Sequence, residues 1–69
     1  MKITYDATAC SGYVKITDHE VVETFSVSSC LLCDVDSDGM PCGFEFINTT
    51  QERLDSFAEA LRSQEGILA

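Results

Sequence analysis

The sequence predicts an α+β fold, in which a four- to five-stranded antiparallel β-meander precedes one C-terminal α-helix that packs on one face of the sheet. Two observations support this layout. Apolar and polar residues alternate in short segments up to residue 48, and a helical period replaces the alternation from residue 49 onward. Because 69 residues suffice for one domain only, we expect a single domain 1–69, with the β-meander in 1–48 and the helix in 49–64.

Residues 2–6 and 13–17 are expected to form the first two strands. In the first of them Ile3 and Tyr5 alternate with polar residues, and the second alternates in the same way. Such a period of two is typical of a strand that is buried on one face. The intervening segment 7–12 consists of small, turn-prone residues, so the two strands should be joined by a short turn.

The middle of the chain predicts an extended strand and then a hairpin. Residues 21–27 are rich in β-branched and aromatic side chains, which favours an extended or edge strand. The apolar runs 30–36 and 40–47 are separated by Ser37-Asp38-Gly39, and Asp-Gly between two such runs is a strong turn signal. Pro41 lacks an N–H group, so it should lie at an edge or at a non-bonding position.

The C-terminal segment predicts a helix of about four turns. Thr49 and Glu52 have the spacing of a capping box, Arg62 would lie in the last turn, and Gly66 is the expected stop. An apolar stripe runs along one side of this helix, and its members are Leu54, Phe57, Ala58 and Leu61.

The hairpin carries apolar side chains at successive positions, so we expect both of its faces to be partly apolar. One helix covers only one face of a sheet, and the chain has little left to cover the other. A second copy would supply that cover, because two-fold dimers dominate among homo-oligomers. The sequence therefore predicts a homodimer or a higher even oligomer, with interface candidates Cys30, Leu32, Phe44 and Phe46.

The residues of the predicted sheet resemble the domain of unknown function 2283 family over about residues 1–48. The resemblance rests on Lys2-Ile3-Thr4-Tyr5-Asp6, on Tyr13-Val14-Lys15-Ile16, and on Asp34-Val35-Asp36-Ser37-Asp38-Gly39 with Gly43-Phe44-Glu45-Phe46. The chain departs from the family pattern at Ala7 and Gly12, where Pro and a larger apolar residue are usual. The resemblance implies a small bacterial, archaeal or phage protein with a β-meander, and it implies no established activity.

The charge and composition of the chain limit the kinds of partner that it is expected to bind. The net charge is -8, and the four Lys and Arg residues are scattered, which argues against direct nucleic-acid binding and against an anionic membrane surface. No apolar run approaches the ~20 residues that span a bilayer, and the N-terminal segment turns polar early, so we expect a cytoplasmic protein. An acidic surface would suit a basic partner protein.

The segment from Asp34 to Glu45 has the residue spacing of a calcium-binding loop. Asp34, Asp36, Asp38 and Glu45 would be the metal ligands, with Gly39 at the sharp turn. Such loops lie between two helices, whereas this one lies between two predicted strands. We therefore expect an acidic β-turn that stabilises the hairpin, with Ca²⁺ binding as the alternative.

Four cysteines and one histidine complete the candidates for chemistry. Cys30 and Cys33 have zinc or redox spacing, but Cys10 and Cys42 do not form a second close pair. Residues three apart in a strand point to opposite faces, so we expect small buried hydrophobic thiols, with Zn²⁺ binding and a reactive thiol as alternatives. His19 lies in a polar turn and should be solvated.

Taken together, these observations on charge, motifs and composition predict a non-enzymatic interaction module without a cofactor.

Overall fold

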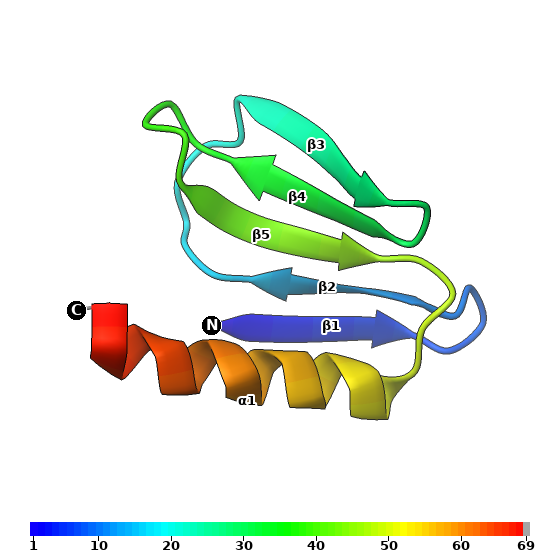
Figure 1. The fold of residues 1–69 in the computed structure, drawn as a ribbon. Helices are drawn as coiled ribbons and strands as arrows, with labels where there is room; N and C mark the ends of the chain where they lie inside the picture. Colours follow the sequence, from blue (N-terminus) through cyan, green and yellow to red (C-terminus); the bar gives the residue numbers. More distant parts are fainter. Residues whose placement is uncertain (69) are drawn as a thin grey trace.

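A computed structural model describes residues 1–68, together with the side chains of residues 1–63. It contains one five-stranded antiparallel sheet and one C-terminal helix (Figure 1), which confirms the predicted fold class. The elements are β1 (Lys2–Asp6), β2 (Ser11–Lys15), β3 (Glu23–Ser28), β4 (Leu31–Val35), β5 (Pro41–Phe46) and α1 (Gln51–Leu68).

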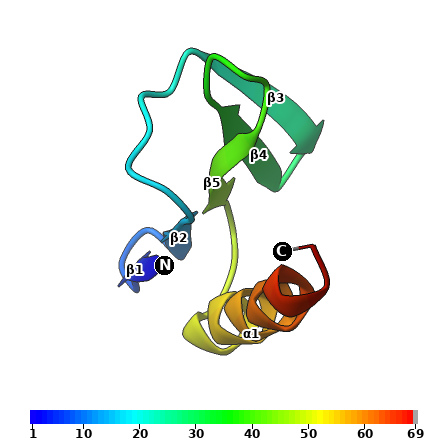
Figure 2. The same cartoon turned by 90° about the vertical axis from the view of Figure 1, so that its left-hand side faces the viewer.

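The strand order in the sheet is β1-β2-β5-β4-β3. The last strand of the chain, β5, therefore lies at the centre and pairs with both β2 and β4 (Figure 1). The strands β1 and β3 form the two edges. Residues 16–22 connect β2 to β3 across the end of the sheet (Figure 2). Alternating hydrophobicity identifies the strands in the sequence, but it does not reveal this order.

Residues that lie opposite each other on paired antiparallel strands share a face of the sheet. Two rows of such residues lie on the face that α1 covers. The first row crosses all five strands through Ile3, Val14, Phe44, Cys33 and Phe25. The second row crosses them through Tyr5, Gly12, Phe46, Leu31 and Ser28.

The core forms where α1 meets this face. The predicted helical stripe is confirmed, because Leu54 and Ala58 are fully buried and Phe57 lies between two aromatic side chains of β5. The Phe57 ring packs edge-on against Phe44 at a centroid distance of 5.0 Å and against Phe46 at 4.8 Å. Such edge-to-face pairs contribute about 0.5–1.5 kcal/mol each beyond their buried area.

Gly12 allows α1 to approach the sheet closely. A Cβ atom at this position would overlap the side chain of Leu54 and would lie 2.8 Å from the carbonyl oxygen of Thr4. A larger side chain at this position would therefore displace the helix. The absence of a side chain here is a structural requirement of this sheet-helix contact.

The helix begins one residue later than the predicted capping box requires. The side-chain oxygen of Thr50 accepts a hydrogen bond from the Arg53 amide at 3.2 Å, so Thr50 is the N-cap residue. Thr49 is buried instead: its amide donates to the carbonyl of Cys10 at 2.7 Å, and its carbonyl accepts from the hydroxyl of Tyr5 at 3.0 Å. The capping-box prediction is wrong because Thr49 is held by the sheet.

The helix also continues beyond its predicted end. It spans Gln51–Leu68 rather than 49–64, so it passes through Gly66 without stopping, and Arg62 lies before the last turn. Glycine is tolerated within a helix at a cost of about 1 kcal/mol relative to alanine. Gly66 was therefore a weak signal for the helix end.

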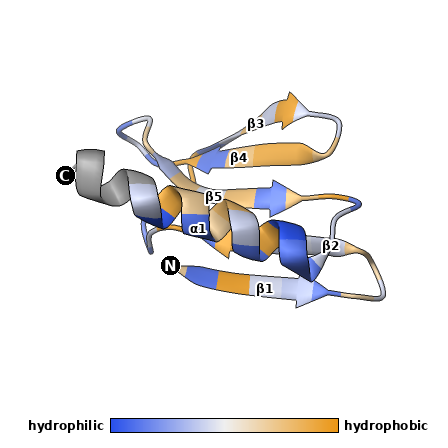
Figure 3. Cartoon of the chain, turned by 60° about the horizontal axis from the view of Figure 1, so that its bottom comes forward, coloured by the Kyte–Doolittle hydropathy of each residue, from blue (hydrophilic) through white to orange (hydrophobic). Residues whose placement is uncertain are grey.

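The helix does not shelter the whole of this sheet face. It contacts β1 and β2 directly and β5 through Phe57, whereas β3 and β4 lie beyond it (Figures 2 and 3). In the first row Val14 and Cys33 are buried, whereas Phe25 on the edge strand is 50% exposed. Val27 on the same strand is 59% exposed. Phe25 and Val27 together are called the β3 patch below.

Candidate functional site

The face of the sheet opposite α1 is polar. Its first row consists of Thr4, Tyr13, Glu45, Leu32 and Ser26, and its second of Lys2, Lys15, Gly43, Asp34 and Thr24. The expectation of an apolar second face therefore holds only at Leu32, which is half-buried. The hairpin residues were correctly assigned to strands, but most of their apolar side chains lie on the helix side.

A hydrogen-bonded cluster crosses this polar face at Asp34. The hydroxyl of Tyr13 donates to one oxygen of the Asp34 carboxylate at 2.6 Å, and the hydroxyl of Thr24 donates to the other at 2.6 Å. Tyr13 reaches Asp34 by lying over Gly43 of β5, where a Cβ atom would overlap the phenol ring. Side-chain hydrogen bonds therefore connect β2, β4 and β3, and the Tyr13 side chain crosses β5 at Gly43.

The same cluster explains the electrostatics of the phenol. Burial and the hydrogen bond to Asp34 both raise the pKa of Tyr13 above its ordinary value. The phenol thus remains a neutral hydrogen-bond donor over the physiological pH range. This arrangement suits a structural brace, because a Tyr that acts as a general base would need a lowered pKa.

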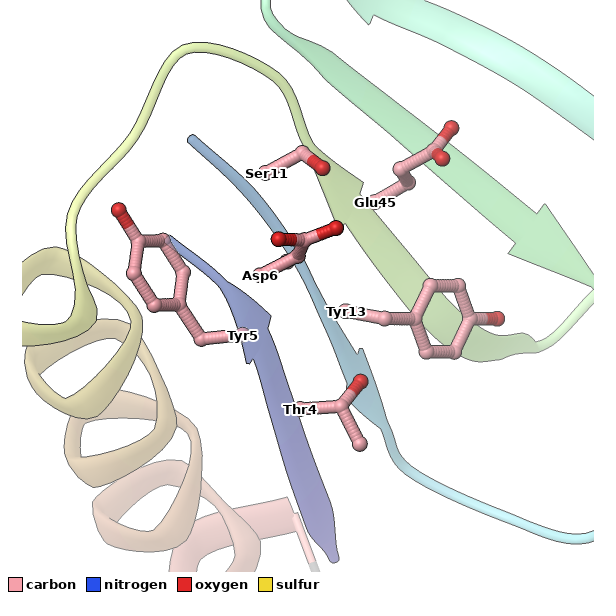
Figure 4. Close-up of a pocket in the computed structure, with 7 residues that line it drawn as sticks. Thr4, Tyr5, Asp6, Ser11, Tyr13 and Glu45 are labelled. Carbon is pink, nitrogen blue, oxygen red and sulfur yellow. The ribbon is translucent and has the colours of Figure 1, made fainter. Parts of the chain in front are cut away.

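A hollow of about 280 Å³ lies beside this cluster (Figure 4). It is lined by Thr4, Tyr5, Asp6, Ser11, Gly12, Tyr13 and Glu45. The Asp6 carboxylate is already used by the β1–β2 turn, since it accepts hydrogen bonds from the amides of Thr8 at 3.0 Å and Ala9 at 3.3 Å. Small-molecule sites are typically ~300–1,000 Å³, so this hollow is at the lower limit of that range.

The acidic hairpin turn is held by Asp36. One oxygen of its carboxylate accepts from the amides of Asp38 at 2.9 Å and Met40 at 3.0 Å, and the other lies 2.8 Å from Nδ1 of His19. The partners His19 and Met40 lower the pKa of this buried carboxyl group, and His19 has the larger effect. Gly39 follows with a φ of 76° and completes the turn. The predicted acidic β-turn is confirmed.

The calcium-loop spacing does not bring its carboxylates together. Asp34 bonds to Tyr13 and Thr24, Asp36 bonds to the turn, and Glu45 lies on β5 opposite Tyr13. Among the residues that the structure describes, no group of three or more His, Cys, Asp or Glu side chains could hold a metal ion. Linear spacing suggested a site because it takes no account of the hairpin, in which Glu45 pairs with Leu32 on β4 and so lies away from the turn that holds Asp36.

His19 was expected to be a solvated loop residue. Its side chain is 65% exposed, but the ring also bridges residues 16–22 to the hairpin turn through Asp36. No sequence signal links the two, since they lie 17 residues apart. The histidine therefore has a structural contact that the sequence did not reveal.

The cysteines, all within the described residues, are free thiols of two kinds. Cys10 and Cys30 are exposed, whereas Cys33 and Cys42 are buried. Both buried sulfur atoms contact the carbonyl oxygen of Asp34, at 3.8 Å and 3.4 Å, and burial raises the pKa of both thiols. The Cys30-x-x-Cys33 pair is divided between a surface turn and the core, so its two thiols have opposite environments.

The four predicted interface residues lie in different places. Phe44 and Phe46 pack under α1, Cys30 is exposed at the β3–β4 turn, and Leu32 is on the polar face. The apolar side chains that are at least half exposed are instead those of Val22, Phe25, Val27 and Met40, and two of these, Phe25 and Val27, form the β3 patch. A usable signal was present in the sequence, because residues 24–33 form its longest run without Asp, Glu, Lys or Arg.

Acidic side chains gather at the end of the sheet where residues 16–22 meet the hairpin turn. Here a second hollow of about 330 Å³ is lined by His19, Glu20, Val22, Asp36, Ser37 and Asp38. Two cations, Lys2 and Lys15, lie at the same end of the sheet, and Lys15 is paired with Asp18 at 2.8 Å. The region, called the acidic end below, therefore carries a surplus of negative charge.

These features define a small α+β protein that presents an apolar strand edge and acidic surfaces around a sheet. The chain belongs to the family described as "Protein of unknown function (DUF2283)", whose match covers residues 2–49. The match thus contains the whole sheet and ends just before α1. No curated protein and no solved structure matches the chain. Within the described residues, every helix is too short or too polar to cross a membrane.

Proposed function

We propose that the protein is a non-enzymatic protein-interaction module that acts as a homodimer in the cytoplasm and binds a basic partner protein. The observation that carries this proposal is the β3 patch. Phe25 and Val27 are 50% and 59% exposed, and Phe25 lies on the sheet face that carries α1. An exposed apolar patch at a strand edge is typical of an interaction surface.

The charge distribution supports a basic protein as the second partner. The chain has a net charge of -8, and the acidic end collects carboxylates on exposed loops around Glu20 and Asp38. Complementary charge accelerates association and favours partners of opposite sign. The β3 patch and the acidic end consist of different residues. Free thiols on all four cysteines agree with a reducing compartment.

Two measurements test this proposal. Light scattering over a range of protein concentrations should give the mass of a dimer, and a strict monomer at high concentration would contradict self-association. Binding of poly-L-lysine as a basic probe should weaken with added salt. A double variant, Glu20→Gln with Asp38→Asn, should bind the probe less tightly than Glu52→Gln with Glu59→Gln, which removes the same charge from α1. Equal loss in both would contradict a role for the acidic end.

A further inference from the structure

The edge strand β3 has an unusual surface for a chain of this charge. All six of its residues are exposed, and its outer side has no neighbouring strand. The opposite edge, β1, carries charges at both ends, Lys2 and Asp6, whereas β3 is charged only at Glu23. Charged residues on an edge prevent pairing with other chains. β3 is therefore the edge that remains open to a further strand.

Backbone hydrogen bonds determine which residues of β3 can bind such a strand. The Ile47 amide donates to the carbonyl of Cys30 at 2.9 Å, so residue 30 directs its backbone toward β5. The N–H and C=O groups of successive residues point alternately to the two sides of a strand. Cys33 lies three residues after Cys30, so its N–H and C=O groups point toward β3, where its partner is Phe25. Phe25 in turn points its N–H and C=O groups toward β4. Its neighbours Thr24 and Ser26 therefore point theirs to the open side of β3.

We propose that the open edge pairs with β3 of a second copy in an antiparallel, two-fold symmetric arrangement centred on Phe25. This inference rests on the homodimer proposed above and assigns its interface. Thr24 exchanges backbone hydrogen bonds with the partner's Ser26, and Ser26 with the partner's Thr24. The two Phe25 residues then face each other as a non-hydrogen-bonded pair, in which side chains approach closely.

Charge favours a second copy as the occupant of this edge. Two chains of net charge -8 repel each other, so they can associate only where charge is sparse, and residues 24–33 carry none. The antiparallel register also places Glu23 beside the partner's Val27, away from the partner's Glu23. A basic protein would gain no charge complementarity at this edge, whereas it would at the acidic end.

The arrangement also accounts for the exposure of β3, which α1 does not cover. Pairing about a two-fold axis perpendicular to the sheet keeps the helix faces of both copies on one side. The two sheets, of five strands each, become one continuous sheet with a helix over each half. The β3 patches of the two copies meet between the helices, where each Phe25 covers part of the other.

Cysteine cross-linking tests the register. In a background with Cys10→Ser, Cys30→Ser and Cys33→Ala, which removes the two exposed thiols and the thiol opposite residue 25 on β4, Phe25→Cys should form a disulfide-linked dimer under mild oxidation. Met40→Cys is the matched control, because Met40 is 60% exposed at the hairpin turn and should remain monomeric on a denaturing gel. Equal cross-linking at both positions would overturn the proposed register.

A charge substitution tests the interface without cysteine chemistry. Phe25→Lys places like charges opposite each other and should raise the dimer dissociation constant by about 30-fold or more. Met40→Lys changes the charge equally and should leave the constant within about twofold. Circular dichroism checks that both variants remain folded. If Phe25→Lys unfolds, the cross-linking experiment decides whether Phe25 lies at the interface. A wild-type monomer would overturn the homodimer itself, whereas a wild-type dimer that Phe25→Lys leaves intact would overturn only this interface.

Discussion

Tyr13→Phe should destabilise the sheet, because it removes the only side-chain hydrogen bond that crosses from β2 over β5 to β4 among the described residues. The lost bond is short, at 2.6 Å, and its acceptor is the carboxylate of Asp34. Hydrogen bonds to charged groups contribute about 1.5–3 kcal/mol net. Because Tyr13 is half-buried and Asp34 keeps its bond from Thr24, we expect a value near the lower limit, about 1.5 kcal/mol.

Urea denaturation followed by circular dichroism measures this loss, at one fixed protein concentration because a dimer is stabilised by mass action. Tyr5→Phe is the control. It removes a hydroxyl that donates at 3.0 Å to a neutral acceptor, the carbonyl of Thr49, and should cost only about 0.5–1 kcal/mol. A loss for Tyr13→Phe that is smaller than the loss for Tyr5→Phe would refute the brace described above.

Three further predictions concern the polar face and the hairpin turn. Gly43→Ala should cost about 1–3 kcal/mol because its methyl group overlaps Tyr13, and the cost should shrink in a Tyr13→Ala background when both are measured by urea denaturation. The lowered pKa of Asp36 contributes stability above pH ~4 that is lost as the pH falls through that pKa. His19→Gln should therefore raise the Asp36 pKa in an NMR titration, and an unchanged titration would contradict the ion pair. Added Ca²⁺ at about 1 mM should leave the amide shifts of residues 34–39 unmoved, since the carboxylates of Asp34 and Asp36 already accept hydrogen bonds.

Local patterns in the sequence predicted the strands and the helical stripe because these depend on neighbouring residues. Alternation at Ile3 and Tyr5 and the stripe through Leu54 were sufficient for that purpose. The strand order was not predictable, because pairing of β2 with β5 joins segments about 30 residues apart. The capping box failed for a similar reason, since a distant carbonyl, that of Cys10, holds Thr49 in the sheet.

In the candidate site, too, features that depend on adjacent residues were predictable, and contacts between distant segments were not. The Asp-Gly turn was evident from adjacent residues, but the bonds from Tyr13 to Asp34 and from His19 to Asp36 each cross between separate segments. The sequence predicted apolar surface on the face opposite the helix, whereas that face is polar. Phe25 remains exposed on the helix side instead, because α1 does not reach the edge strand β3.

The central position of β5 has a consequence for how the chain is made. Until residues 41–46 leave the ribosome, the growing polypeptide contains two separate hairpins, β1–β2 and β3–β4, that share no backbone hydrogen bond. Each of them is marginal in water as a two-stranded unit. The final strand joins both at once, so assembly should be abrupt and late, and any fragment that ends before residue 41 lacks the element that unites its halves.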